Sequence, residues 1–173
     1  MNYTELVAAI KSYTENDYTT TDVNTFIQNA EQRIFNTVQI PNLRKNVTGT
    51  MTSGNKFFSL PSDWLSTFSI SVINSSNEHT FLLNKDVNFI REAFPDTDSP
   101  FYALPQYYAI FDDTTMLLGP TPDANYTAEL HYYYYPQSIV TATNTWLGDN
   151  FDTALFYGAL LEAAAFMKEE PDV

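Results

Sequence analysis

Few residues of this sequence have side chains that could perform acid–base or metal chemistry. Cysteine is absent, which excludes a thiol nucleophile, a disulfide and a thiolate metal site. The two histidines, His79 and His131, each lie in a strand-like segment, and no His-x-x-x-His spacing pairs them. A lone histidine in a strand is usually structural. We therefore predict no metal, no cofactor and no enzymatic activity.

Two pairs of aspartates are the remaining candidates for cation binding. Asp113 follows Asp112 directly, and Asp98 lies two residues after Asp96. Aspartate favours turns and loops. Neither pair lies in a segment with the complete set of calcium ligands of an EF-hand loop. The sequence also lacks a Gly-x-Ser-x-Gly motif and a phosphate-binding glycine loop, and it has only 5 glycines. We interpret both pairs as turn residues.

The chain is strongly acidic. Eight Lys and Arg residues against 21 Asp and Glu residues give a net charge of -13. Such a chain repels the backbone of nucleic acids, and Arg44-Lys45 is its only basic pair. We therefore predict no specific DNA binding, although DNA can slide past an acidic surface without adhering to it.

Neither end of the sequence carries a membrane signal. The N-terminal segment has no basic region and no apolar region of a secretory signal. The longest weakly charged stretch, Thr153 to Met167, contains Glu162 and is too short to span a bilayer. We expect a chain that is made in the cytoplasm and does not associate with membranes.

Helical periodicity marks both ends of the chain. Apolar residues lie on one helical face over 3–13, and again from Asp22, the expected N-cap, to Val38. Pro41 then ends the helical pattern. The two segments predict an antiparallel helix pair. A third helix, Phe151 to Lys168 with Asn150 or Asp149 as its cap, is apolar almost all round, which indicates burial in a bundle or against a neighbouring subunit.

The middle of the chain is predicted to be rich in strands. Segments 46–52 and 56–60 flank Ser53-Gly54 and predict a hairpin. In the strand 67–73, Phe68, Ile70 and Val72 are expected on one face. Segment 80–83 is a further strand, and Asn84 is the expected cap of a short helix at 85–94.

Two more strand signals follow. Segments 106–111 and 115–118 predict a second hairpin around Asp112-Asp113. Segment 126–135 predicts a long strand. Its alternation places five residues on one face: Thr127, Glu129, His131, Tyr133 and Tyr135.

These elements predict an α+β fold in which the N- and C-terminal helices form a small bundle and a β-rich region is inserted between them. The predicted domains are a helical bundle of residues 1–45 with 146–173, and a β-rich inserted domain of residues 46–145 that has one short helix near 85–94.

Aromatic residues make up 16% of the chain, which is typical of strands and contact surfaces. The run Tyr132 to Tyr135 is open to two interpretations. It is either a platform for stacking bases or sugars, or a strand that packs on a core and on a partner. Net charge disfavours nucleic acid. A carbohydrate-binding module that uses Tyr107, Tyr133 and Tyr135 stays open as an alternative.

Several stretches, taken in order, cover nearly the whole chain: NAEQRIF (29–35), LRKNVTGTMTSGNKFFSLPSDWLSTFSISV (43–72), LLNKDVNFIREAFPD (82–96), QYYAIFDDTTMLLGPTPDANYTAELHYYYYP (106–136) and WLGDNFDTALFYGALLEAAAFMKEEPDV (146–173). Together they resemble the head-tail adaptor, or connector, proteins found beneath the portal of tailed phages, often short-tailed ones. The resemblance implies a helical bundle with a β-rich insertion and no enzymatic activity. It also implies that such chains continue past the segment 170–172, whereas this sequence ends at Val173.

The resemblance further implies a place in the virion neck. The chain is expected to form a dodecameric ring that binds the portal protein on one side and tail or nozzle proteins on the other, with DNA passing through unbound. The expected contacts to the portal or to a neighbouring subunit are Phe151, Leu155, Phe166, Met167 and Lys168. The expected contacts to the tail or to a neighbouring subunit are Asp112, Asp113, Tyr133 and Tyr135. Another neck or tail-completion protein stays open as an alternative.

Overall fold

The computed structural model describes residues 1–95 and 99–168 and has an α+β fold, as predicted. Contacts divide the chain into two compact units. Met1–Leu43 with Tyr135–Val173 form one, here called the helical unit, and Arg44–Tyr134 form the other, here called the β unit. The predicted division into a helical bundle domain of residues 1–45 with 146–173 and an inserted domain of residues 46–145 stays a prediction.

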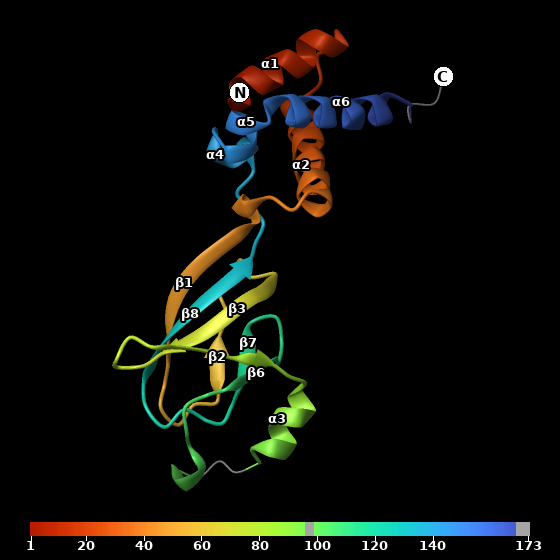
Figure 1. Cartoon of the computed structure of the whole chain (residues 1–173). Helices are drawn as coiled ribbons and strands as arrows, with labels where there is room; N and C mark the ends of the chain where they lie inside the picture. The colour runs from red at the N-terminus through yellow and green to blue at the C-terminus, as the bar shows by residue number, and fades with distance from the viewer. Residues whose placement is uncertain (96–98, 169–173) are drawn as a thin grey trace. The chain divides into compact units, whose positions relative to one another are not determined.

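The helical unit contains the two predicted N-terminal helices, the predicted C-terminal helix and two short helices (Figure 1). They are α1 (Tyr3–Thr14), α2 (Thr20–Thr37), α4 (Ile139–Ala142), α5 (Trp146–Asn150) and α6 (Asp152–Lys168), with a 3-10 turn at Pro41–Leu43. The prediction missed α4 and α5 because helices of 4 and 5 residues are too short to show a period. Their caps, Ser138 and Thr145, each accept a backbone N–H.

The cap of α2 lies three residues earlier than predicted. Thr19, not Asp22, is the N-cap, and its Oγ1 accepts a hydrogen bond from the backbone N of Asp22 at 3.2 Å. In turn, the Asp22 carboxylate accepts a hydrogen bond from the backbone N of Thr19 at 3.3 Å. This reciprocal pair is a capping box, in which the acidic residue stands at the third helical position.

Helix α6 organises the helical unit. It packs against both α1 and α2, whereas α1 and α2 do not form the predicted antiparallel pair. Gly158 permits the close approach, because a Cβ at this position would lie 3.1 Å from Ala30 Cβ. The core of the unit comprises Leu6, Ile10, Tyr18, Val23, Phe26, Ile27, Ala30, Ile139, Leu147, Leu155, Ala159 and Ala163. The apolar face of α6 is thus shared between two helices.

The β unit consists of two four-stranded sheets, with strand orders β1-β8-β3-β4 and β2-β7-β6-β5, here called the first and second sheets. The strands are β1 (Arg44–Met51), β2 (Phe57–Ser59), β3 (Ser66–Ile73), β4 (His79–Phe81), β5 (Leu83–Asn84), β6 (Tyr107–Ile110), β7 (Thr115–Gly119) and β8 (Tyr126–Tyr133). A helix, α3 (Val87–Ala93), and a 3-10 turn at Ser99–Phe101 complete it. Asp86, not the predicted Asn84, caps α3, because Asn84 belongs to β5.

Side chains from both sheets meet in one core. It comprises Met51, Phe58, Ile70, Val72, Leu82, Tyr108, Met116, Leu118, Ala128, Leu130 and Tyr132. On the other face of the second sheet, Ile90 of α3 packs on Ala109 and Leu117. The β unit is therefore layered as first sheet, second sheet and α3, and α3, the helix of the unit's described residues, packs on the second sheet (Figure 1).

The predicted hairpin around Ser53-Gly54 is wrong. Strand β1 pairs with β8, and β2 pairs with β7, so the turn carries the chain from one sheet to the other. The 122–125 loop holds the turn, because the Gly54 N–H bonds to the Pro122 carbonyl at 2.8 Å. Gly54 has φ 75°, a conformation that glycine adopts without strain. The predicted hairpin around Asp112-Asp113 is confirmed as β6 and β7.

The alternation predicted that Phe68 shares a face with Ile70 and Val72, and this prediction is wrong. The pairing of β3 with β8 shifts between Thr67 and Ser69, which is a β-bulge at Phe68. The extra residue reverses the alternation. Phe68 is therefore 50% exposed on the outer face, whereas Ile70 and Val72 lie in the core.

Glu31 is a buried carboxylate of the helical unit, at 3% exposure. Its Oε1 accepts a hydrogen bond from the backbone N of Ile139 at 2.9 Å, which satisfies a donor in the first turn of α4. Burial raises the pKa of Glu31, and the hydrogen bonds from Ile139 and Ser138 oppose that shift. The Glu31 carboxyl group therefore binds its proton more tightly in the folded chain than in the unfolded chain.

Leu130→Ala should destabilise the β unit by about 2–5 kcal/mol, because Leu130 is 1% exposed between the two sheets. Thr127→Ala on the same strand is the matched control, since Thr127 is exposed and should change stability by less than about 0.5 kcal/mol. Urea unfolding followed by circular dichroism measures both. Equal effects of the two substitutions would contradict the two-sheet core.

Glu31→Gln should remove a pH dependence of stability. With a raised pKa, the ionised carboxylate costs stability at neutral pH, and stability rises as pH falls through the folded pKa towards 4.5. Glutamine keeps an acceptor for Ile139 without the charge, so its urea midpoint should match or exceed that of the wild type at pH 7. Glu31→Ala leaves the N–H unpaired and should cost about 1–3 kcal/mol. A glutamine variant as unstable as the alanine variant would refute this account.

Candidate functional site

The outer face of the first sheet is formed by the alternation of β8. Ala128, Leu130 and Tyr132 point into the core, so the residues between them point outwards. The predicted common face of Glu129, His131 and Tyr133 follows from this register. Tyr135 does not belong to it, because β8 ends at Tyr133 and Tyr135 lies in the helical unit.

Phe68 is the centre of an aromatic and cationic cluster on this face. The Arg44 guanidinium lies 4.3 Å from the centroid of the Phe68 ring and 5.3 Å from that of Tyr133. The Phe68 ring meets His131 edge-on at 5.0 Å and Tyr133 at 6.0 Å. Exposed contacts of this kind contribute about 0.5–1 kcal/mol each. The prediction missed Arg44 and Phe68 because it placed Phe68 on the same face as Ile70 and Val72.

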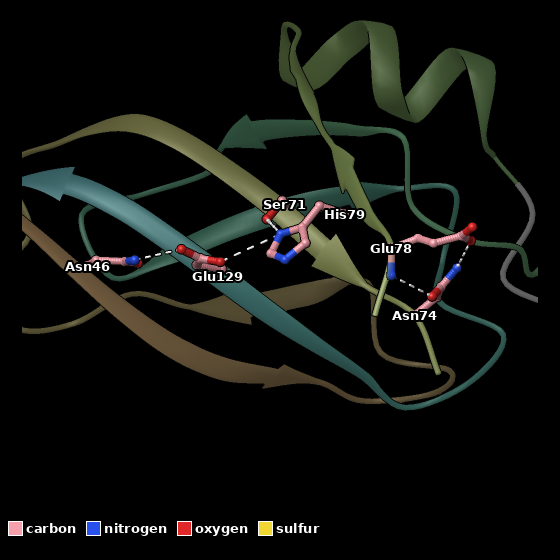
Figure 2. Close-up of polar contacts among 6 residues, drawn as sticks. All are labelled: Asn46, Ser71, Asn74, Glu78, His79 and Glu129. Atoms are coloured by element: carbon pink, nitrogen blue, oxygen red, sulfur yellow. Dashed lines mark hydrogen bonds and ion pairs between the residues drawn. The ribbon is translucent and has the colours of Figure 1, made fainter. Parts of the chain in front are cut away.

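A line of polar contacts crosses all four strands of the same sheet (Figure 2). Asn46 on β1 donates to Glu129 on β8 at 2.6 Å. The other oxygen of Glu129 lies 3.6 Å from Nδ1 of His79 on β4. Ser71 on β3 lies 3.1 Å from the same Nδ1. Each strand contributes one residue, so the contacts tie the strands together.

This line contains a serine, a histidine and a glutamate, but its geometry is not that of a hydrolytic triad. In a triad the serine and the carboxylate contact opposite nitrogens of the imidazole. Here Ser71 and Glu129 both approach Nδ1 of His79, and Ser71 is 2% exposed. Within residues 1–95 and 99–168, no three His, Cys, Asp or Glu side chains gather as metal ligands.

Every basic side chain of the β unit lies over an aromatic ring of that unit. The contacts are Arg44 over Phe68 and Tyr133, Lys45 over Tyr134, Lys56 over Phe57, Lys85 over Phe89 and Tyr107, and Arg91 over Phe111. Lys45 also donates to Asp63 at 2.8 Å, and Tyr132 donates to the other oxygen of Asp63 at 2.7 Å. These two hydrogen bonds lower the pKa of Asp63. The sole basic pair of the sequence thus contacts neighbouring side chains.

The four residues expected to face the tail lie in three places. Asp112 is in the β6–β7 turn, where its carboxylate accepts from the Thr114 N–H and hydroxyl, both at 2.8 Å, which lowers its pKa. Asp113 is exposed beside it. Tyr133 belongs to the outer face of the first sheet. Tyr135 is in the helical unit, where its hydroxyl donates to Asn36.

Three tyrosines proposed as a sugar platform are not brought together. Tyr107 contacts Phe89 at 5.6 Å and Phe94 at 6.0 Å, beneath α3 on the second sheet. Tyr133 lies on the outer face of the first sheet, on the opposite side of the core. Tyr135 belongs to the helical unit. Tyr107 and Tyr133 therefore do not form one sugar-binding face.

The residues expected to contact the portal lie along α6 and just before it. Phe151 is 52% exposed and packs beside Trp146 at 5.4 Å. Leu155 is 1% exposed in the helical core, so its side chain packs within the chain and is not available to a partner. Phe166 and Met167 are exposed by 44% and 43%. Lys168 is the last residue of α6, and its side chain lies outside the described part of the chain.

An apolar groove of about 570 Å³ runs between the end of α1 and the outer side of α6. Its lining residues are Tyr13, Thr14, Tyr157, Leu160, Leu161, Ala164 and Met167. The spacing of 157, 161 and 164 is one face of a helix, opposite the buried face of Leu155, Ala159 and Ala163. The sequence indicates such a groove only through the apolar residues on both faces of α6. The fold is needed to show which of the two faces is exposed.

Comparison with known proteins gives one family. A family model described as SU10 adaptor protein matches residues 1–172, which is nearly the whole chain. No curated protein matches the sequence. Among the helices that the structure describes, none has the length and apolar character needed to cross a membrane.

Proposed function

Because the chain belongs to the SU10 adaptor protein family, we propose that it is a head-to-tail adaptor of a phage virion. In this proposal twelve copies, as the sequence resemblance implies, form a ring between the portal protein and the tail or nozzle proteins, and the ring continues the DNA channel. The family match over residues 1–172 is the observation that carries the proposal. The function is structural, with the chain acting through its contacts.

Exposed apolar side chains of the helical unit support a role in assembly. Tyr13, Tyr157 and Leu161 are exposed by 66%, 54% and 63% and lie around one groove. Contiguous apolar surface of this kind marks interaction sites, because covering it stabilises a complex by about 25 cal/mol per Å². A chain with such a surface gains stability when a partner subunit covers it.

The charge distribution supports a channel through which DNA moves. The net charge of -13 repels phosphate, and the five basic residues of the β unit lie over aromatic rings. Binding to phosphates would require these side chains to leave their aromatic contacts. We propose that DNA passes such a ring without adhering.

We propose contacts among the side chains that are accessible in each unit. Phe151, Phe166 and Met167 are proposed contacts to the portal or a neighbouring subunit. Asp112, Asp113 and Tyr133 are proposed contacts of the β unit to tail proteins or a neighbouring subunit. Tyr135, which belongs to the helical unit, is likewise a proposed contact to tail proteins or a neighbouring subunit.

Mixing the chain with the portal protein of the same phage should give a complex with one adaptor per portal subunit. Size exclusion with light scattering measures its mass, and each protein alone is the control. A chain that does not bind the portal protein but binds the tail tube would instead be a neck or tail-completion protein. A chain that binds neither would contradict the proposal.

Raising the salt concentration should favour ring assembly. Neighbouring copies that each carry -13 repel one another, and at 0.15 M salt this repulsion is screened beyond roughly 8 Å. Sedimentation of portal–adaptor mixtures at low and physiological salt measures the effect. A ring that dissociates as salt rises would show that attractive ion pairs hold the subunits together.

A further inference from the structure

A small pocket of the helical unit, here called the Glu31 pocket, contains the buried glutamate in its lining. Its volume is about 210 Å³. One wall is a face of α2 whose residues follow one another at helical spacing, namely Gln28, Glu31, Gln32 and Phe35. The other wall is the segment from Tyr135 towards α4. Both walls belong to the same compact unit, so the unit forms the pocket by itself.

The hydrogen bonds that the Glu31 carboxylate accepts come from neutral donors. An ionised carboxylate has about four acceptor positions. The Ile139 N–H, at 2.9 Å, and the Ser138 side chain take up two of them. Arg33, the basic residue of α2, lies two residues further on and so on the opposite side of the helix, where it pairs with Glu162 at 2.6 Å. The Glu31 carboxylate therefore has acceptor capacity left for a charged donor.

Burial makes the charge of Glu31 costly in the isolated chain. Its side chain is 3% exposed, and this burial raises the pKa of the carboxyl group, which disfavours the ionised form. A cationic group inside the pocket would favour the ionised form, because opposite charges attract more strongly where water is excluded. It would thereby offset the desolvation cost of the carboxylate. The pocket is suited to a cation that carries hydrogen-bond donors.

The rest of the lining favours a guanidinium group over an ammonium group. The rings of Phe35 and Tyr135 border the pocket, with their centroids 6.4 Å apart. A planar guanidinium stacks on aromatic rings and binds a carboxylate through two parallel hydrogen bonds. The amide oxygens of Gln28 and Gln32 are acceptors for its other N–H groups. An ammonium is compact and more strongly hydrated, so it gains less from aromatic walls.

We propose that the Glu31 pocket binds an arginine side chain of a partner protein, with the guanidinium against the Glu31 carboxylate. The net charge of -13 attracts basic segments of other proteins and disfavours a second copy of this chain as the source of the arginine. The inference rests on the proposed function for the identity of the partner, which is another protein of the virion.

Titration of the full chain with a blocked amino acid tests the pocket directly. The probe is acetyl-arginine amide, and two-dimensional proton–nitrogen NMR at constant ionic strength follows the backbone amides. The probe should give saturable shifts at Gln28, Gln32 and Ile139. Acetyl-citrulline amide has nearly the same shape without the charge and should give none. Acetyl-lysine amide has the same charge without the planar group and should bind more weakly than the arginine probe.

Two variants separate the pocket from the general attraction of an acidic chain for cations. Glu31→Gln keeps an acceptor for the Ile139 N–H but removes the charge, so it should weaken binding of the arginine probe by about tenfold or more. Glu15→Gln is the matched control, because it removes the same charge at the exposed C-cap of α1. It should leave the affinity unchanged. Far-ultraviolet circular dichroism checks that both variants fold.

Several outcomes would overturn the inference. They are no saturable shift with the arginine probe, an equal response to the citrulline or lysine probe, and unchanged affinity in Glu31→Gln. Failure of the proposed function is a separate result. A chain that binds the portal protein but not the arginine probe would overturn only the pocket. A chain that binds the arginine probe as expected, but neither the portal nor tail proteins, would support the pocket and refute the proposed function.

Discussion

Strand β8 is the element on which the β unit depends. It pairs along its length with β1 on one side and β3 on the other, so it is central to the first sheet. Because side chains alternate along a strand, Leu130 and Tyr132 fill the core while His131 and Tyr133 form the outer face. The same eight residues therefore set both the stability of the unit and the surface that it presents. The Phe68 bulge on β3 adds the one outward ring that brings Arg44, His131 and Tyr133 into contact.

Helix α6 has the corresponding role in the helical unit, but its chemistry is different. Small residues on its buried face, Ala159 and Ala163 with Gly158 beside them, permit close packing against α2. Its outer face carries large apolar residues such as Tyr157 and Leu161, which are exposed within the described part of the chain. A helix of an isolated protein would place polar residues there. In the proposed ring, the helix would have two interfaces, one inside the unit and one with the portal or a neighbouring subunit.

Electrostatics restrict how such a chain associates. An excess of carboxylates makes copies repel one another and repel DNA, and the five basic residues of the β unit contact aromatic rings. In the proposed ring, long-range attraction between copies would therefore be weak, and short-range apolar contact would supply the affinity. Glu31 shows how a carboxylate is accommodated inside the helical unit. Its buried carboxylate is retained because it satisfies the Ile139 N–H at the start of α4.

The sequence by itself determined the α+β class, the long helices, most strands and the β6–β7 hairpin, because each of these depends on local periodicity and turn residues. It also determined the acidic charge and the absence of thiol chemistry. Only the tertiary structure decided that β1 pairs with β8, that Phe68 lies outside the core, and that Leu155 lies inside its own core and not at a surface. Strand partners, a one-residue bulge and the open face of an all-apolar helix depend on contacts between residues far apart in the chain. Local pattern does not encode which of two apolar faces another segment will cover.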